Sequence, residues 1–155
     1  MNMTNEKKMF WEDFVPGVRE RMGQVIVDRE EVIDFARRYD PQPFHIDEEE
    51  AENSIYGGII ASGWHTCSMV MRLMCDSYLL NSSSLGSPGI EGVKWPRPVY
   101  PDDVLTAFRT VTETRASSSK PDRGIVKTFW ETENQNGDVV MSMTGINFFL
   151  RRRAE

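Results

Sequence analysis

Residues 39–47 read YDPQPFHID, and they place an aspartate and a histidine five positions apart with two prolines between them. A carboxylate and an imidazole can hold one water molecule together, since one group can take its proton while the other orients it or returns a proton to the product. An imidazole titrates near neutral pH, which suits this task. We therefore interpret Asp40 and His45 as an acid–base pair.

The segment between the two residues must bend before their side chains can meet. Five fully extended residues span about 16 Å, which is too far for one shared water. Pro41 and Pro43 restrict φ and so reduce the conformational entropy lost in holding a bent shape. We expect a bent loop here and not a helix. A structural interpretation stays open, in which Asp40 caps a turn and His45 packs on the next helix.

A second group with a chemical use is the amide of Gly63, in the stretch GGIIASGWHT (57–66). A backbone N–H at the start of a helix has no partner within the helix, and the helix dipole favours negative charge there. Such an amide could stabilise a carbonyl oxygen that gains charge. The alternative role of Gly63 is close packing between helix and sheet. We interpret His65 as structural or pocket-lining, not as a base.

Several other kinds of site do not fit the sequence. Trp64 stands where a phosphate-binding loop needs its lysine, and no G-x-S-x-G motif surrounds Ser62, so we expect neither nucleotide binding nor a serine hydrolase. Asp40, His45, Asp47 and His65 match no common metal-ligand spacing, so we expect no metal.

Length and composition indicate one globular domain spanning residues 1–155. The net charge of −6 argues against nucleic-acid binding. We expect neither a secretory signal nor a membrane span, because no apolar stretch is long enough for either. Cys67 and Cys75 would lie about 12 Å apart on one helix, too far for a disulfide. These features favour a cytoplasmic protein.

The element that must position Gly63 is an apolar helix at about 62–80, with Ser62 as its N-cap. Apolar residues occupy most of its circumference, so we expect the helix to be buried on nearly all sides. Met69, Met71 and Met74 are either core residues or, since methionine side chains are adaptable, neighbours of a bound apolar group.

Shorter elements precede this helix, and long strands follow it. We expect an extended opening segment, a strand at 24–27, a helix capped by Asp28 that ends by Tyr39, and a short acidic helix at 47–53. Strands are expected at 90–99, 103–116, 124–134 and 138–151, with a tight turn at Asn136-Gly137. Long antiparallel strands around one apolar helix define an α+β fold.

Three stretches together resemble the MaoC-like dehydratases, the family of (R)-specific enoyl-CoA hydratases with a hot-dog fold. They are FARRYDPQPFHIDEEEA (35–51), GGIIASGWHT (57–66) and VKWPRPVYPDDVLT (93–106). The resemblance implies catalytic roles for Asp40 and His45 and an oxyanion-hole role for the Gly63 amide. It also implies reversible addition of water to a trans-2-enoyl thioester, in a pocket at a dimer interface. No cofactor is expected beyond coenzyme A as part of the substrate.

Further residues are expected to contact the substrate. Gly58, Ser62 and Trp64 belong to the second stretch, whereas Lys94 and Arg97 could meet the coenzyme A phosphates, as could the Arg151–Arg153 cluster if it is not merely a solvated tail. Two positions depart from the family pattern. Gln42 stands where asparagine is common, and Asp102 stands where a turn glycine is expected, at a position that would strain aspartate if its φ is positive.

Two other functions remain open. A hot-dog thioesterase would direct water at the thioester carbonyl and release free thiol. A non-catalytic binding module would hold an acyl thioester and turn nothing over, although an intact Asp40/His45 pair argues against it.

Overall fold

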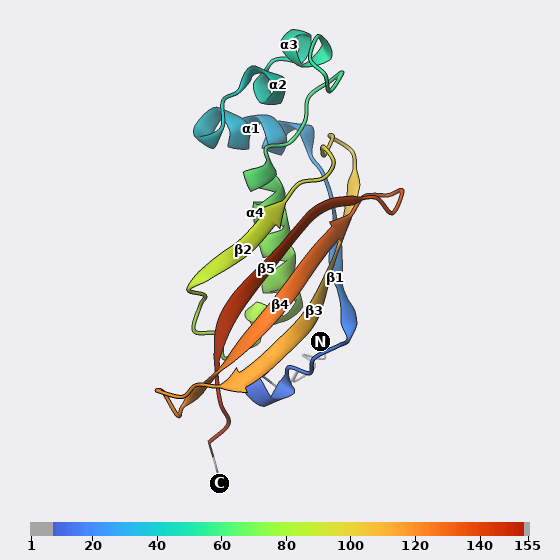
Figure 1. The fold of residues 1–155 in the computed structure, drawn as a ribbon. Helices are drawn as coiled ribbons and strands as arrows, with labels where there is room; N and C mark the ends of the chain where they lie inside the picture. The colour runs from blue at the N-terminus through green and yellow to red at the C-terminus, as the bar shows by residue number, and fades with distance from the viewer. Residues whose placement is uncertain (1–7, 154–155) are drawn as a thin grey trace, which may run out of the picture.

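The chain divides into a mainly helical first half and a second half of long strands (Figure 1). The computed structural model describes residues 8–153. The helices of this part are α1 (Arg29–Tyr39), α2 (Pro43–Ile46), α3 (Glu48–Glu52) and α4 (Gly63–Met74), with a 3-10 turn at Trp11–Asp13 and a π-helical segment at Cys75–Leu79. The strands are β1 (Arg19–Ile26), β2 (Gly89–Lys94), β3 (Val104–Ala116), β4 (Arg123–Glu133) and β5 (Val139–Leu150).

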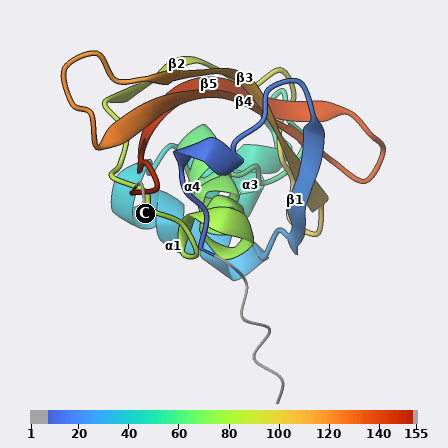
Figure 2. The same ribbon diagram turned by 90° about the horizontal axis from the view of Figure 1, so that it is seen from below.

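These strands form one antiparallel sheet in the order β1-β3-β4-β5-β2. The sheet curves around α4, as seen along the molecule in Figure 2. The expected α+β hot-dog architecture, with a long antiparallel sheet wrapped around a central apolar helix, is confirmed. Within residues 8–153, no helix is both long enough and apolar enough to cross a membrane.

The core lies between the concave face of the sheet and α4. Every second residue of β4 from Gly124 to Thr132 is buried, which is the period-2 pattern of a strand with one face on the core. The buried Trp130 donates its indole N–H to the hydroxyl of Tyr78, at 3.3 Å, just beyond the end of α4. Met69 and Met74 are core residues, whereas Met71 is 45% exposed.

Local sequence signals explain the helices before α4. The Asp28 side chain accepts a hydrogen bond from the Glu31 amide, at 2.9 Å, and α1 ends at Tyr39, as expected. The prediction of a bent loop and no helix between Asp40 and His45 is wrong in part, because residues from Pro43 onward form the one-turn helix α2. Pro43 is its first residue, and a proline is tolerated there because that N–H has no helical partner.

The strand expected at 90–99 is also wrong in part, because β2 ends at Lys94. Pro96 and Pro98 have no N–H to donate to a sheet, so the chain leaves the ladder after Lys94 and continues as an irregular segment. β1 is longer than expected and begins at Arg19. Cys67 and Cys75 are both free, as expected.

Candidate active site

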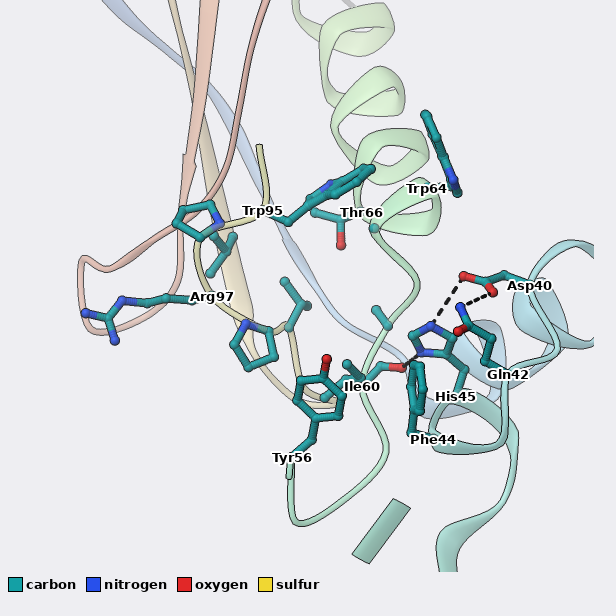
Figure 3. Close-up of a pocket in the computed structure, with 16 residues that line it drawn as sticks. Asp40, Gln42, Phe44, His45, Tyr56, Ile60, Trp64, Thr66, Trp95 and Arg97 are labelled. Atoms are coloured by element: carbon teal, nitrogen blue, oxygen red, sulfur yellow. Dashed lines mark hydrogen bonds and ion pairs between the residues drawn. The ribbon is translucent and has the colours of Figure 1, made fainter. Parts of the chain in front are cut away.

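The helices α1, α2 and α3 cluster at the end of the molecule where α4 begins (Figure 1). Asp40 is the C-cap residue of α1, and His45 lies in α2. The short turn between them brings the Asp40 Oδ2 and His45 Nε2 atoms within 3.3 Å of each other. Both side chains line a cavity of about 500 Å³. Figure 3 shows them on the same side of it.

The imidazole of His45 is buried, and its other nitrogen is held by the backbone. Nδ1 lies 2.6 Å from the carbonyl oxygen of Ile60, and a carbonyl can only accept, so Nδ1 carries a proton and donates it. Nε2 consequently faces Asp40 and the cavity. It is therefore the ring atom placed to exchange a proton with a bound molecule.

Three neighbours hold the Asp40 carboxylate. Ser62 donates its hydroxyl to Oδ2 at 2.7 Å, and Gln42 donates its amide to Oδ1 at 2.7 Å. Partial burial alone would raise the pKa of Asp40, but the hydrogen bonds from Ser62 and Gln42, with the nearby His45, outweigh it and lower the pKa. Asp40 is therefore ionised at neutral pH, as a general base must be. Gln42, the departure from the family pattern, contacts the carboxylate directly.

Gly63 is the first residue of α4, so its amide N–H has no partner within the helix. A Cβ at this position would lie 2.5–2.8 Å from three atoms of the Trp95 indole. Any side chain would thus push Trp95 aside, so Gly63 does allow close packing, although against the Trp95 side chain just after β2 and not against the sheet itself. The amide role is compatible with it, because the packing concerns the Cα and not the N–H.

The cavity brings together some of the expected site residues and not others. Asp40, His45, Gly63, Trp64 and Arg97 line it. The Arg97 side chain is largely exposed, points away from the other lining side chains in Figure 3 and lies 3.8 Å from Asp138.

Ser62, Gly58 and Lys94 do not line the cavity. Ser62 is fully buried, and its hydroxyl is directed at Asp40. The Arg151–Arg153 cluster lies at the opposite end of the molecule (Figure 1), where Arg151 and Arg152 face the acidic pair Glu12 and Asp13.

His65 lies outside this cavity. Its ring is buried and stacks on Phe35, with ring centroids 4.9 Å apart. Burial lowers the pKa of His65, although the nearby Glu31 opposes the shift. Asp47 caps α3 through the Glu50 amide. Across the described residues, no three His, Cys, Asp or Glu side chains gather into a group that could hold a metal ion.

The cavity also contains residues that sequence reasoning missed, chiefly Tyr56, Thr66 and Trp95. Thr66 follows Gly63 by three positions and so lies on the same face of α4, a spacing that could have indicated it. Tyr56 and Trp95 lie in irregular segments, where no periodic pattern predicts the direction of a side chain.

Comparisons with known proteins agree with this fold. A family model described as "MaoC like domain" matches residues 17–135. The chain is 30% identical over 109 residues to the uncharacterized protein YdeM of Bacillus subtilis (strain 168), over 70% of this chain and 76% of YdeM.

Two solved structures extend the comparison. A MaoC-like dehydratase from Rhodospirillum rubrum is 40% identical, with a TM-score of 0.87 over 94% of this chain and 99% of that one. An R-hydratase from Pseudomonas aeruginosa shares the fold at 17% identity, with a TM-score of 0.74 over 96% of this chain and 93% of that one.

Proposed function

Because this chain belongs to the family of MaoC-like dehydratases, we propose that it adds water reversibly to the 2,3-double bond of a trans-2-enoyl-CoA thioester. The product is a 3-hydroxyacyl-CoA. The observation that carries the proposal is the contact between the ionised Asp40 and the cavity-facing Nε2 of His45, beside the free amide of Gly63. The reaction exchanges no electrons with a cofactor, and coenzyme A enters as part of the substrate.

Each residue has a defined role in the proposed reaction. A water molecule binds to Asp40 and to Nε2 of His45, and Asp40 accepts its proton. The water oxygen forms a bond to C3, and the electron pair of the double bond moves through C2 to the thioester oxygen. The pair then delivers a proton to C2, which completes the addition.

The Gly63 amide stabilises the intermediate in this scheme. The thioester oxygen gains charge as an enolate, and a fixed N–H at a helix N-terminus favours a negative charge at that point. Removal of one such donor costs about 10²–10³ in kcat in enzymes where it has been measured. Since Gly63 also accommodates Trp95, replacing it would disturb packing and could not isolate the amide's contribution.

The test follows the loss of enoyl-thioester absorbance of crotonyl-CoA at neutral pH, with a thiol reagent in a parallel sample. We expect absorbance to fall without thiol release. Asp40→Asn keeps the size of the side chain but removes the base, so the rate should fall about 100-fold or more.

The other outcomes separate the competing functions. Thiol release would indicate a thioesterase. Binding of enoyl thioesters without any turnover, across a panel of chain lengths, would indicate a binding module. An Asp40→Asn variant as active as the wild type would contradict the assignment of the base, whatever the substrate.

A further inference from the structure

Two hydroxyl groups face the proposed active-site cavity from opposite sides. Figure 3 shows the Thr66 hydroxyl directed into the cavity from α4 and the Tyr56 hydroxyl directed into it from the loop after α3. Neither hydroxyl has a hydrogen-bond partner among residues 8–153. Thr66 is only 1% exposed, so its hydroxyl has little access to bulk water. The hydroxyl borders the cavity, so a molecule bound there is an available partner for it.

The Thr66 hydroxyl does not bond to the partner that a helical threonine usually has. A serine or threonine inside a helix commonly bonds to the carbonyl four residues earlier. Ser68 does so, donating to the Trp64 carbonyl at 2.8 Å. Thr66 makes no such bond to Ser62, whose carbonyl accepts only the Thr66 amide, at 3.1 Å, within the described part of the chain. The Thr66 hydroxyl is therefore left available to a bound molecule.

The position of Thr66 indicates which part of a substrate it would meet. It lies one helical turn beyond Gly63, about 4.5 Å further along the axis of α4. Gly63 is where the thioester oxygen binds in the proposed reaction, so Thr66 lies alongside the acyl chain. Apart from His45, the other buried residues that line the cavity are apolar: Ile60, Ala61, Val99 and Val140.

The charges around the cavity indicate whether a polar group on that acyl chain would be charged or neutral. Arg97 is the one cationic side chain with a permanent charge in the lining, and it is exposed and directed away (Figure 3). A carboxylate beside Thr66 would have no buried counter-charge and would face the ionised Asp40, which is costly. A neutral hydroxyl or carbonyl group carries no such penalty and can bond with both hydroxyls.

We propose that Thr66, with Tyr56 opposite, selects an enoyl thioester whose acyl chain carries a neutral oxygen-containing group. This inference rests on the proposed hydratase function for its substrate class. Its test can nevertheless be made by equilibrium binding alone, without turnover.

The probes are 4-hydroxybutanoyl-CoA and pentanoyl-CoA, which differ only in a terminal hydroxyl or methyl group and cannot be hydrated. We expect the wild type to bind the hydroxylated thioester about 10-fold more tightly, since the apolar analogue leaves Thr66 unpaired. Thr66→Val keeps the shape of the side chain and should abolish this preference. Tyr56→Phe should reduce it.

Thr132→Val is the matched control, because Thr132 is also a buried threonine whose hydroxyl lacks a partner within the described residues, but it lies outside the cavity. This variant should keep the wild-type preference. Equal affinity of the wild type for the two probes, or no measurable affinity for either, would overturn the inference. If the wild type prefers the hydroxylated probe but shows no hydratase activity, only the catalytic proposal is rejected.

Discussion

At the residue scale, one oxygen of Asp40 has two partners. Its Oδ2 accepts the Ser62 hydroxyl at 2.7 Å and lies 3.3 Å from Nε2 of His45. Ser62 is fully buried, so no water can replace its hydroxyl without a rearrangement. Ser62 was expected to contact the substrate; in this geometry it instead positions the base and favours its ionised form.

Replacing Ser62 with alanine should therefore move the acid limb of the kcat/KM profile to higher pH. The hydrogen bond from Ser62 lowers the pKa of Asp40, so its loss raises that pKa, and the base becomes protonated at a higher pH. The measurement is the pH–rate profile with crotonyl-CoA. Ser68→Ala is the control, because Ser68 lies on α4, which Ser62 precedes, and within residues 8–153 its hydroxyl bonds only to the Trp64 carbonyl. An unchanged acid limb in Ser62→Ala would contradict this role.

The same variant should be less stable than the wild type at neutral pH, and urea unfolding should show this difference shrink as the pH falls below 3.8. The lowered pKa of Asp40 stabilises the fold above the usual value of 3.8, and this contribution is lost as the pH falls through the lower folded value. Without Ser62, the folded pKa lies closer to 3.8, so this contribution to stability is smaller at neutral pH and less of it is lost on acidification.

At the scale of elements, the end of β2 shapes the cavity. After Lys94, two prolines prevent further pairing, and the chain crosses over the start of α4. Trp95 packs there on the Cα of Gly63 and edge-on against Trp64, with ring centroids 5.3 Å apart. The termination of the strand thus creates a wall of the site.

The turn at residues 100–103, just before β3, contains a strained residue. Asp103 donates its amide to the Tyr100 carbonyl at 3.2 Å, Pro101 takes the second position, and Asp102 has a φ of 72°. This pattern fits a type II turn, whose third position favours glycine. The condition under which aspartate would be strained at this position, a positive φ, is therefore met.

Asp102→Gly should stabilise the protein by about 0.5–1 kcal/mol, because relief of the left-handed strain exceeds the entropy that glycine adds to the unfolded chain. Thermal unfolding should show a rise of roughly 2–4 °C for a change of about 1 kcal/mol. Asp102→Ala should change stability in the opposite direction, since alanine tolerates this conformation less well than aspartate. A lower Tm for the glycine variant would show that interactions of the Asp102 side chain contribute more to stability than the backbone strain costs.

At the scale of the whole molecule, the central helix is not covered on all sides. Trp64 and Met71, seven residues apart on α4, are 59% and 45% exposed. Ile90 and Trp95, on or just beyond β2, are 47% and 41% exposed. β2 is an edge strand that pairs only with β5. The expectation of a helix buried nearly all round is therefore wrong for the isolated chain.

We expect a second copy of the chain to cover this face. Sedimentation equilibrium should then give twice the 17.8 kDa mass of the chain. Met71→Glu would place a charge in the buried contact and should weaken association at least about 10-fold. Val15→Glu is the control, since Val15 is also exposed but precedes β1, the other edge of the sheet. A wild-type mass of 17.8 kDa would exclude this assembly at the concentration used.

Features that depend on near neighbours were readable from the residues alone. The Asp28 cap reaches three residues ahead, and Gly137, in the stretch where a turn was expected, has a positive φ. The strand pattern and the resemblance together predicted the hot-dog fold. The Asp40/His45 contact was also accessible, because only four residues separate the pair and its prolines restrict the turn.

Contacts between distant segments required the folded chain. Ser62 lies 22 positions from Asp40, and the cavity-facing direction of Tyr56 depends on an irregular loop. The sequence does not distinguish Thr66 from an ordinary helical residue; only the folded chain places it in the cavity lining with Trp95. Local preferences extend over about four residues along a helix or across one turn, whereas the path of the chain decides which distant groups meet. The sequence therefore predicted the proposed base, Asp40. It did not predict the hydrogen bond from Ser62 or the hydroxyl groups that face the cavity.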